Sequence, residues 1–509
     1  MENGTNQERH LSPKEWEIYN KIRHCMRKLR QKSMMYVCNE ETKEFYTTRG
    51  RHCLQVAHIT LDLVTAFGGD RVSAVLMGAG HDYGHSVLAH TGEAALGRFL
   101  MSPDEFIPWE GIKTRNYFDH SKHSVVALQR ECQREGIELP VIIANGIEAH
   151  STGSKGSSGK YKSFEAECVM RADKIASSIS DTQDLIKSGA LNINNKSALE
   201  KDFLESEEVK DTVRTRVFGK IDFNSPSSLT KIMDRILKDA ENPLSEDAIE
   251  AFNKFRKDNG VEGISSPKYE NILSDFLAQN SGTVKKYVEG MVTRYIQNAI
   301  DFLLLPPEEQ LETMKGVIIE ETQKRNKECG GVITGYQEKY EKNQLFVPEQ
   351  YDAILAAFRG IMIQKEISRE IGKLGAELEG LVETVARYVY TNQSTFENEE
   401  PFKNWLTDVD GKRFNWEETV AYALVEMGDM EFKDFTISLL DRGAKDTLKT
   451  CKYRDPRDEN WLKRHPDASL DYNNKDFSTK ESIEEAFKTD ITRKAQPSQI
   501  SKRNLGFAK

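Results

Sequence analysis

Histidine and acidic side chains are concentrated in one part of the chain. Eight of the eleven histidines lie between His52 and His150, and three of these fall within ten residues that begin at His81. Imidazole and carboxylate groups both hold divalent metals and move protons near neutral pH. A cluster this dense, followed by Asp173 in a later apolar segment, predicts a metal-dependent hydrolytic site.

Four of these side chains can share one metal ion. The neighbours His81 and Asp82 come at the end of an apolar helical segment, His52 begins the preceding one, and Asp173 lies in a later one. Antiparallel packing would bring all four together in the core of a helical bundle, where metal sites are common. Two imidazoles and two carboxylates suit Mg²⁺, Mn²⁺ or another transition metal, with positions left open for water.

A second group of side chains could carry acid–base chemistry. If a turn follows Gly84, His90 and Glu93 lie three apart on a helix and can face the same way. A carboxylate beside an imidazole orients it and raises its basicity, as in an activated base or nucleophile. Further candidates at the rim, each more typical by itself of a structural or surface residue, are His120, His123, Glu148 and His150.

The elements that must position these groups are predicted to be helices, which indicates an all-α protein. Apolar residues recur at helical spacing and strand signals are few. The expected helices cover 14–35, 52–67, 72–80, 121–135, 139–149, 163–186, 246–257, 268–304, 307–327, 348–391 and 416–449. The Ser/Gly-rich segment 151–160 is expected to be a loop, either a surface connection or a flap whose Lys155 and Lys160 reach phosphates.

Composition narrows the class of protein. A net charge of −10 and a pI near 5.7 argue against a globally basic nucleic-acid binder, although 23–51 carries eight Lys or Arg. That segment is either a polyanion contact or a solvated helix face. Seven cysteines without a Cys-x-x-Cys pair, no signal peptide and no membrane-spanning stretch favour a cytoplasmic protein. We expect a core at 1–240, a helical region at 241–455 and a polar, mobile tail at 456–509.

The order of these motifs resembles the HD-domain superfamily and, within it, the deoxynucleoside triphosphate triphosphohydrolases of the dGTPase family. The motifs that carry the resemblance are Arg49-x-x-His52, His81-Asp82-x-Gly-His85, His90-x-x-Glu93 and Arg-Ala-Asp173-Lys-Ile-Ala. Arg30-Gln-Lys32 before them and Asp181-Thr-Gln-Asp184 after them extend the match to about residues 23–190. The resemblance implies an HD-domain helical bundle with additional C-terminal helices.

The resemblance also implies roles for individual residues. The metal ligands would be His52, His81, Asp82 and Asp173, and the catalytic residues His90, Glu93 and His120. Phosphates would be contacted by Arg49, His85 and Lys174. Lys32, Met34 and Ser177 fall in the substrate-binding segments; the last two replace a glutamine and a tyrosine common in the family. The implied reaction converts a dNTP, with dGTP favoured, into a deoxynucleoside and inorganic triphosphate, and the implied assembly is a homo-oligomer.

Two other functions fit the same residues. An HD-type phosphodiesterase or nucleotidase would keep the metal but take another nucleotide, and it need not carry His90-x-x-Glu93. A regulatory module that binds nucleotides or single-stranded nucleic acid would use the basic segment 23–51 and would not need four buried metal ligands.

Overall fold

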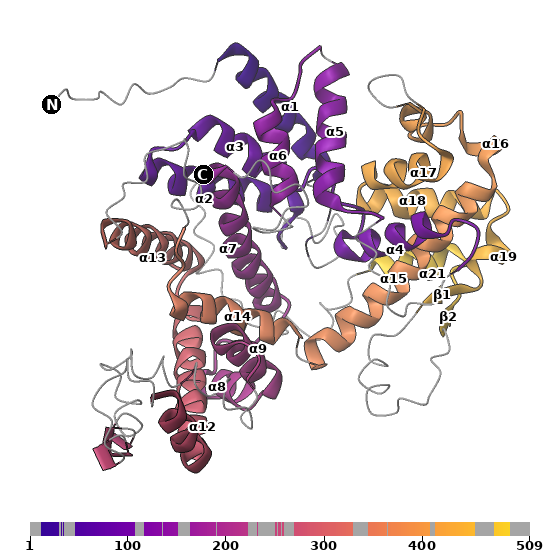
Figure 1. The fold of residues 1–509 in the computed structure, drawn as a ribbon. Coiled ribbons are helices and arrows are strands. Elements are labelled where there is room, and N and C mark those ends of the chain that lie inside the picture. Colours follow the sequence, from indigo (N-terminus) through magenta and orange to yellow (C-terminus); the bar gives the residue numbers. More distant parts are fainter. Residues whose placement is uncertain are drawn as a thin grey trace. The chain divides into compact units, whose positions relative to one another are not determined.

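A computed structural model gives the fold of most of the 509-residue chain (Figure 1). The residues that it describes are 12–29, 32, 34, 46–106, 117–134, 136–150, 163–189, 191–221, 232, 250–251, 253–255, 257–258, 269–328, 345–363, 365–407, 413–453 and 473–488. They cluster into two compact units. The first draws on 1–191, 315–346 and 368–509, and the second on 192–314 and 347–367.

Almost all secondary-structure elements of the described residues are helices, which confirms the predicted all-α class. Helices at the start of the first unit are α1 (Pro13–Leu29), α2 (Arg49–Phe67), α3 (Arg71–Gly80), α4 (Ala89–Met101), α5 (His120–Arg134), α6 (Val141–Ala149) and α7 (Phe164–Lys187). Its later elements are α16 (Gln393–Phe396), η4 (Phe402–Trp405), α17 (Trp416–Glu426), α18 (Asp429–Leu440), α19 (Lys445–Leu448) and α21 (Lys480–Phe487). A short antiparallel pair, β1 (Cys451–Tyr453) and β2 (Asn473–Lys475), accompanies them.

Helices α2, α3 and α7 form the bundle that holds the four predicted metal ligands. The side chain of Thr48 caps α2, and that of Asp70 caps α3, so both helices begin at defined residues. Helix α3 passes so close to α2 that a Cβ atom at Gly78 would lie 2.7 Å from the Cα atom of Ala57. This close approach fixes the C-terminal end of α3, where His81 follows.

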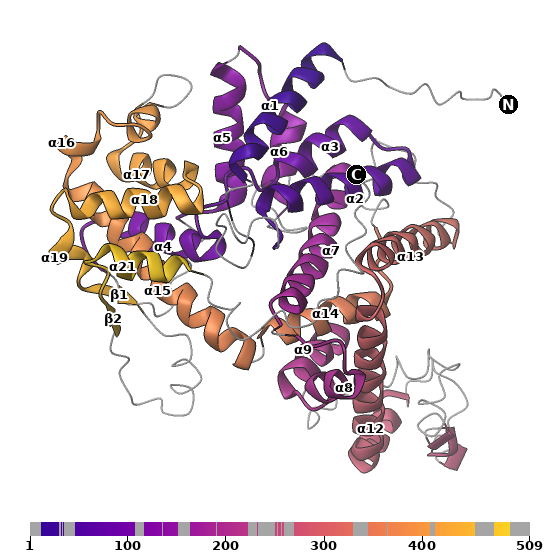
Figure 2. The same ribbon diagram turned by 180° about the vertical axis from the view of Figure 1, so that it is seen from behind.

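Helix α4 is packed among helices from the C-terminal part of the chain. Its buried side chains Leu96 and Phe99 belong to one hydrophobic cluster with Leu381 of α15 (Lys365–Thr391) and Leu424 of α17. Figure 2 shows α4 between α15, α17 and α18, as Figure 1 does from the opposite side. The helix that carries His90 and Glu93 is therefore held by segments about 300 residues away in sequence.

The second unit is a separate helical cluster. Its helices are α8 (Lys196–Leu204), α9 (Glu207–Phe218), α12 (Tyr269–Leu303) and α14 (Glu349–Ile363), and α13 (Pro307–Glu328) begins in it. Arg216 of α9 donates two hydrogen bonds of 2.7 Å to the carboxylate of Asp352 in α14. Among the helices that the structure describes, none combines the length and the apolar character needed to cross a membrane.

Several expected boundaries differ from the structure. The helix expected over 416–449 divides into α17, α18 and α19, with Gly428 and Gly443 at the breaks. Within 348–391 the structure describes α14 and α15, and residue 364 between them lies outside the described residues. Within the tail expected to be mobile, residues 473–488 form β2 and α21. Phe477, Ile483 and Phe487 of this segment are buried in the core, an apolar set too short to show periodicity.

Other expectations fall outside the described residues. These are the domain borders at 240/241 and 455/456, the loop with Lys155 and Lys160, half of the helix expected over 246–257 and about half of the basic segment 23–51. Each of them stays a prediction.

A buried ion pair should contribute strongly to the packing of α4. The guanidinium of Arg98 donates to Glu383 of α15 at 2.8 Å and also pairs with Glu379. We expect Arg98→Met to lower the free energy of unfolding by about 3–5 kcal/mol, because it leaves the buried carboxylate of Glu379 without its cation, while Glu383 keeps Arg387. Denaturant unfolding measures this change. Arg134→Met, which breaks an exposed pair with Glu131, is the control and should cost less than about 1 kcal/mol; equal losses would contradict the expectation.

Candidate active site

The segment between α3 and α4, residues 81–88, is here called the active-site loop. His81 is the C-cap of α3, and its Nδ1 donates a hydrogen bond of 2.8 Å to the carbonyl oxygen of Gly78. Because this bond uses the Nδ1 proton, the neutral ring has its lone pair on the other nitrogen, Nε2. That atom is fully buried and has no hydrogen-bond partner. A buried imidazole nitrogen left free in this way is what a metal ligand requires.

The other three predicted metal ligands surround this nitrogen. His81 Nε2 lies 3.5 Å from Asp82 Oδ2 and 3.7 Å from Asp173 Oδ1. His52 Nε2 lies 3.0 Å from the same Asp173 oxygen and 3.9 Å from Asp82 Oδ2. His52, His81 and Asp173 have ligand atoms that converge within 4.8 Å, so these residues have the donor set and the spacing to hold a divalent metal ion.

Arg49 supports the carboxylate at the centre of this group. Its Nη1 donates a hydrogen bond of 2.6 Å to Asp82 Oδ2, and both side chains are buried. Burial alone would raise the pKa of Asp82, but the charges of His81 and Arg49 hold it well below its usual range. Arg49 is the first residue of α2. Just before it, the backbone N–H and the hydroxyl of Thr47 donate hydrogen bonds to the carboxylate of Asp184 in α7. The acidic turn after Asp173 thus anchors the segment that presents Arg49 and His52.

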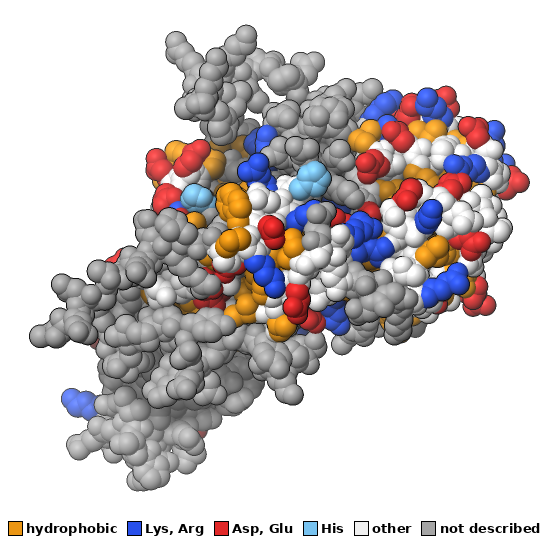
Figure 3. Space-filling model, turned by 90° about the horizontal axis from the view of Figure 1, so that it is seen from above, with side chains coloured by type: hydrophobic (Ala, Val, Ile, Leu, Met, Phe, Trp, Pro, Cys, Tyr) orange, Lys and Arg blue, Asp and Glu red, His pale blue; other side chains and the backbone are white. Residues whose placement is uncertain are grey.

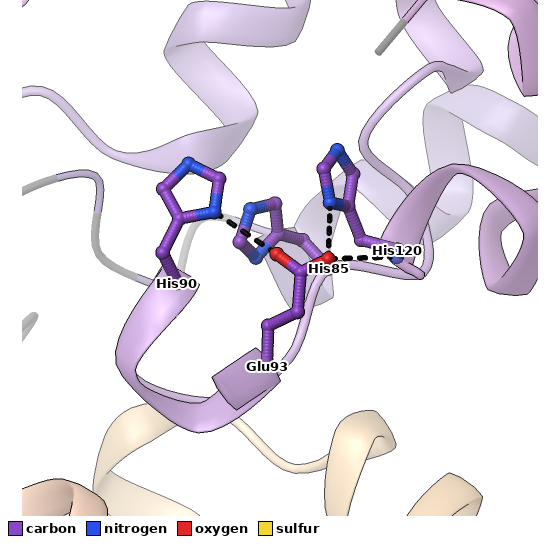
Figure 4. A group of neighbouring side chains, drawn as sticks. All are labelled: His85, His90, Glu93 and His120. Atoms are coloured by element: carbon purple, nitrogen blue, oxygen red, sulfur yellow. Dashed lines mark hydrogen bonds and ion pairs between the residues drawn. The ribbon is translucent and has the colours of Figure 1, made fainter. Parts of the chain in front are cut away.

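Glu93 joins two histidines beside the metal ligands. Its carboxylate lies between His90 and His120 (Figure 4). His90 Nδ1 is 3.0 Å from Glu93 Oε2, while the backbone N–H and Nδ1 of His120 lie 3.2 and 2.9 Å from Oε1. Burial raises the pKa of Glu93, but the hydrogen bonds from His120 and His90 more than offset this and lower it. The His90 ring is 64% exposed, so the group reaches from the buried donors to solvent.

His150 joins the site, although the sequence indicated only a residue at the rim. It is the C-cap of α6, and its Nδ1 donates to the carbonyl of Ile147 at 2.6 Å. Its Nε2 lies 3.5 Å from Asp82 Oδ1 and 3.3 Å from His120 Nε2. Asp82, His120 and His150 therefore form a second group of converging donors. The signal that could have found His150 is its position at a helix end, the same as that of His81.

His85 is buried with both ring nitrogens unpartnered, and it stacks on His120 at a centroid distance of 4.6 Å. Burial and the nearby charge of Arg49 lower its pKa well below the usual value, which keeps the ring neutral. Two other histidines of the cluster do not reach the site. His58 is exposed on α2, and His123 packs against Trp405 and Tyr422.

The remaining predicted substrate-binding residues differ in their burial and in the contacts of their side chains. The ammonium of Lys32 donates to the carbonyls of His85 and Val425 inside the protein, and Ser177 donates to the carbonyl of Asp173. Lys174 is exposed and Met34 is partly buried. Direct contact of these four residues with a substrate stays a prediction. Cys53, buried beside His81 and Asp82, was not predicted as a site residue.

Comparison with known proteins identifies the type of domain that holds the site. Residues 49–178, which include all four predicted metal ligands, match the family model of the HD domain, so the chain carries an HD domain. The resemblance predicted from the motifs is confirmed.

Curated relatives agree with this assignment. The chain is similar to a protein of Clostridium perfringens named deoxyguanosinetriphosphate triphosphohydrolase-like protein, at 30% identity over 38% of this chain and 54% of the relative. A relative of the same name from Clostridium tetani is 32% identical over 35% of this chain and 46% of its own length. One from Mesorhizobium japonicum is 27% identical over 33% and 45%. The chain spans about half the length of the curated relatives it matches.

Proposed function

We propose that this protein is a metal-dependent triphosphohydrolase that converts a dNTP, with dGTP preferred, into a deoxynucleoside and inorganic triphosphate. One observation carries the proposal. The His90–Glu93–His120 group meets the metal donor set at Asp82, whose Oδ1 lies 3.7 Å from His120 Nε2. A phosphoryl hydrolase needs charge neutralisation and a proton acceptor next to each other, and the names of the relatives agree with a triphosphate substrate.

The proposed reaction uses the residues as follows. His52, His81, Asp82 and Asp173 would hold Mg²⁺ or Mn²⁺, which when bound supplies positive charge to the phosphoryl oxygens. With its Nδ1 proton donated to Glu93, His90 presents Nε2 as an acceptor for the proton of a water molecule. The oxygen of that water bonds to the α-phosphorus, and the bond from this phosphorus to O5′ breaks. O5′ takes up a proton from solvent to leave as the deoxynucleoside hydroxyl, and His90 releases the proton of the water to solvent.

Buried groups without internal partners fit phosphate contacts. Both ring nitrogens of His85 and the Nε of Arg49 make no hydrogen bond, although all three atoms are buried. Such orphaned groups are costly unless something binds to them. In the proposal, phosphate oxygens accept hydrogen bonds from His85 and Arg49, while the exposed Lys174 attracts the triphosphate from solvent.

The test is product analysis. We expect incubation of each dNTP and of GTP with the protein and Mg²⁺ or Mn²⁺ to yield triphosphate and the nucleoside on anion-exchange chromatography, with dGTP fastest. Pyrophosphate or orthophosphate as the first product would contradict cleavage at the α-phosphorus and favour another HD chemistry. Equal rates with dGTP and GTP would mean that Met34 and Ser177 do not exclude the ribose hydroxyl.

The proposal also includes the cellular location, the oligomeric state and the partners of the protein. No disulfide bond joins Cys53, Cys132, Cys168 or Cys451, which supports a reducing cytoplasm. We keep a homo-oligomer as part of the proposal. Contact with single-stranded nucleic acid has less support, since basic and acidic side chains are interspersed over the described part of the face in Figure 3. A nucleic-acid surface is typically a basic stripe.

A further inference from the structure

We propose that the turn joining α17 to α18, residues 425–429, positions the active-site loop for catalysis. The turn lies outside the HD domain match at 49–178, yet it is joined to the loop by buried polar contacts at both of its ends. Asp429 and Lys32 are the positioning residues. The kinetic part of this inference rests on the proposed function.

Lys32 connects one end of the turn to the loop. Its buried ammonium donates 2.6 Å to the carbonyl oxygen of Val425 and 2.7 Å to that of His85. Val425 lies in the last turn of α17, where helix carbonyls have no partner within the helix and the helix dipole favours a cation. The same ammonium group therefore provides a hydrogen-bond partner for a carbonyl at the end of α17 and holds the backbone of His85 in place.

Asp429 connects the other end of the turn. It is the first residue of α18 and is fully buried, and its Oδ1 accepts a hydrogen bond of 3.0 Å from the backbone N–H of Leu88. The N-terminus of α18 stabilises this buried carboxylate electrostatically. Leu88 immediately precedes α4, so Asp429 fixes the point from which His90 and Glu93 emerge.

The loop needs such contacts because its backbone is strained. Leu88 and Ala89 have φ values of 56° and 54°, in the left-handed region that side chains disfavour. A strained conformation persists only where the surroundings hold it in place. Val87 and Leu88 of the loop also belong to the same hydrophobic cluster as Met427 of the turn.

A purely structural role for Asp429 would give different results. If Asp429 only stabilised the N-terminus of α18, its loss would lower the melting temperature and leave the hydrogen exchange of the loop and the kinetic constants unchanged. The positioning role predicts a local effect on the loop, measurable in the full-length protein without substrate. Asp429→Asn keeps an oxygen acceptor of the same shape, and Asp441→Ala removes an exposed carboxylate at the other end of α18, so they are the matched rescue and control variants.

The experiment combines hydrogen exchange with kinetics. In Asp429→Ala we expect peptides that span the active-site loop to exchange about tenfold faster, because a hydrogen bond to a charged group is lost. With dGTP, kcat should fall about 10- to 100-fold, as for a small misplacement of catalytic groups, while KM and metal content stay unchanged. Asp429→Asn should restore most of both properties, and Asp441→Ala should match the wild type.

Unchanged exchange of the loop in Asp429→Ala would overturn the inference. If the wild type hydrolyses no dNTP, the proposed function fails, but the exchange measurement still decides whether the turn positions the loop. If Asp429→Ala does not fold, Lys32→Met tests the same inference at the other end: faster exchange around His85 supports it, and wild-type exchange overturns it.

Discussion

Asp82→Asn is expected to remove the bound divalent metal and to abolish hydrolysis. Each oxygen of this carboxylate faces two imidazole nitrogens, His81 and His52 at Oδ2 and His120 and His150 at Oδ1. Asparagine keeps the volume and an oxygen that can accept from Arg49, so the fold should be retained. The negative charge and one oxygen ligand are lost. We expect affinity for Mn²⁺ to fall more than about 100-fold, beyond the loss typical of an outer-shell partner.

Calorimetric titration with Mn²⁺ and elemental analysis of the purified variant measure this effect. The matched control is Asp62→Asn, which lies on α2 with His52 but pairs with Lys315 at 2.6 Å outside the site. It should bind metal as the wild type does. If Asp82→Asn and Asp173→Asn both retained wild-type metal content, the assignment of the four ligands would be wrong.

The sequence was informative where a motif and a helix end coincide. An apolar segment that ends at His81 predicted a buried helix delivering a histidine and an aspartate, and α3 does so. The spacing of His90 and Glu93 likewise predicted a helix-borne pair, and α4 presents it. These are local relationships, in which the distance along the chain sets the distance in space.

Long-range contacts could not be predicted in the same way. The sequence predicts Lys32 as a substrate-binding residue, which stays a prediction, but it gives no sign that the Lys32 ammonium donates to the carbonyls of His85 and Val425, 53 and 393 residues away. Asp429 is 341 residues from Leu88, and no periodicity links them. His150 reaches Asp82 only because α6 packs on α3 and α7. These contacts depend on tertiary packing, so they cannot be predicted from a sequence motif within the HD domain.

Glu93→Gln is expected to lower turnover by about 100- to 10,000-fold while leaving the metal in place. Glutamine has the shape of the carboxylate, but only one of its two ends can accept a hydrogen bond, so it can orient His90 or His120 and not both. His90→Ala, at a largely exposed ring, should show the same loss with little change in stability. Glu131→Gln on α5, the helix of His120, is the control and should keep full activity.

Single-turnover kinetics and metal analysis of the same samples separate two interpretations of this group. His85, His90, Glu93 and His120 also have donor atoms within 4.8 Å of one another, so they could hold an ion themselves. If Glu93→Gln lost metal together with activity, the group would be a metal site and the acid–base assignment would fail. Retained metal with lost turnover is what an acid–base group requires, because its carboxylate acts on protons and leaves the ligands at His52, His81 and Asp173 intact.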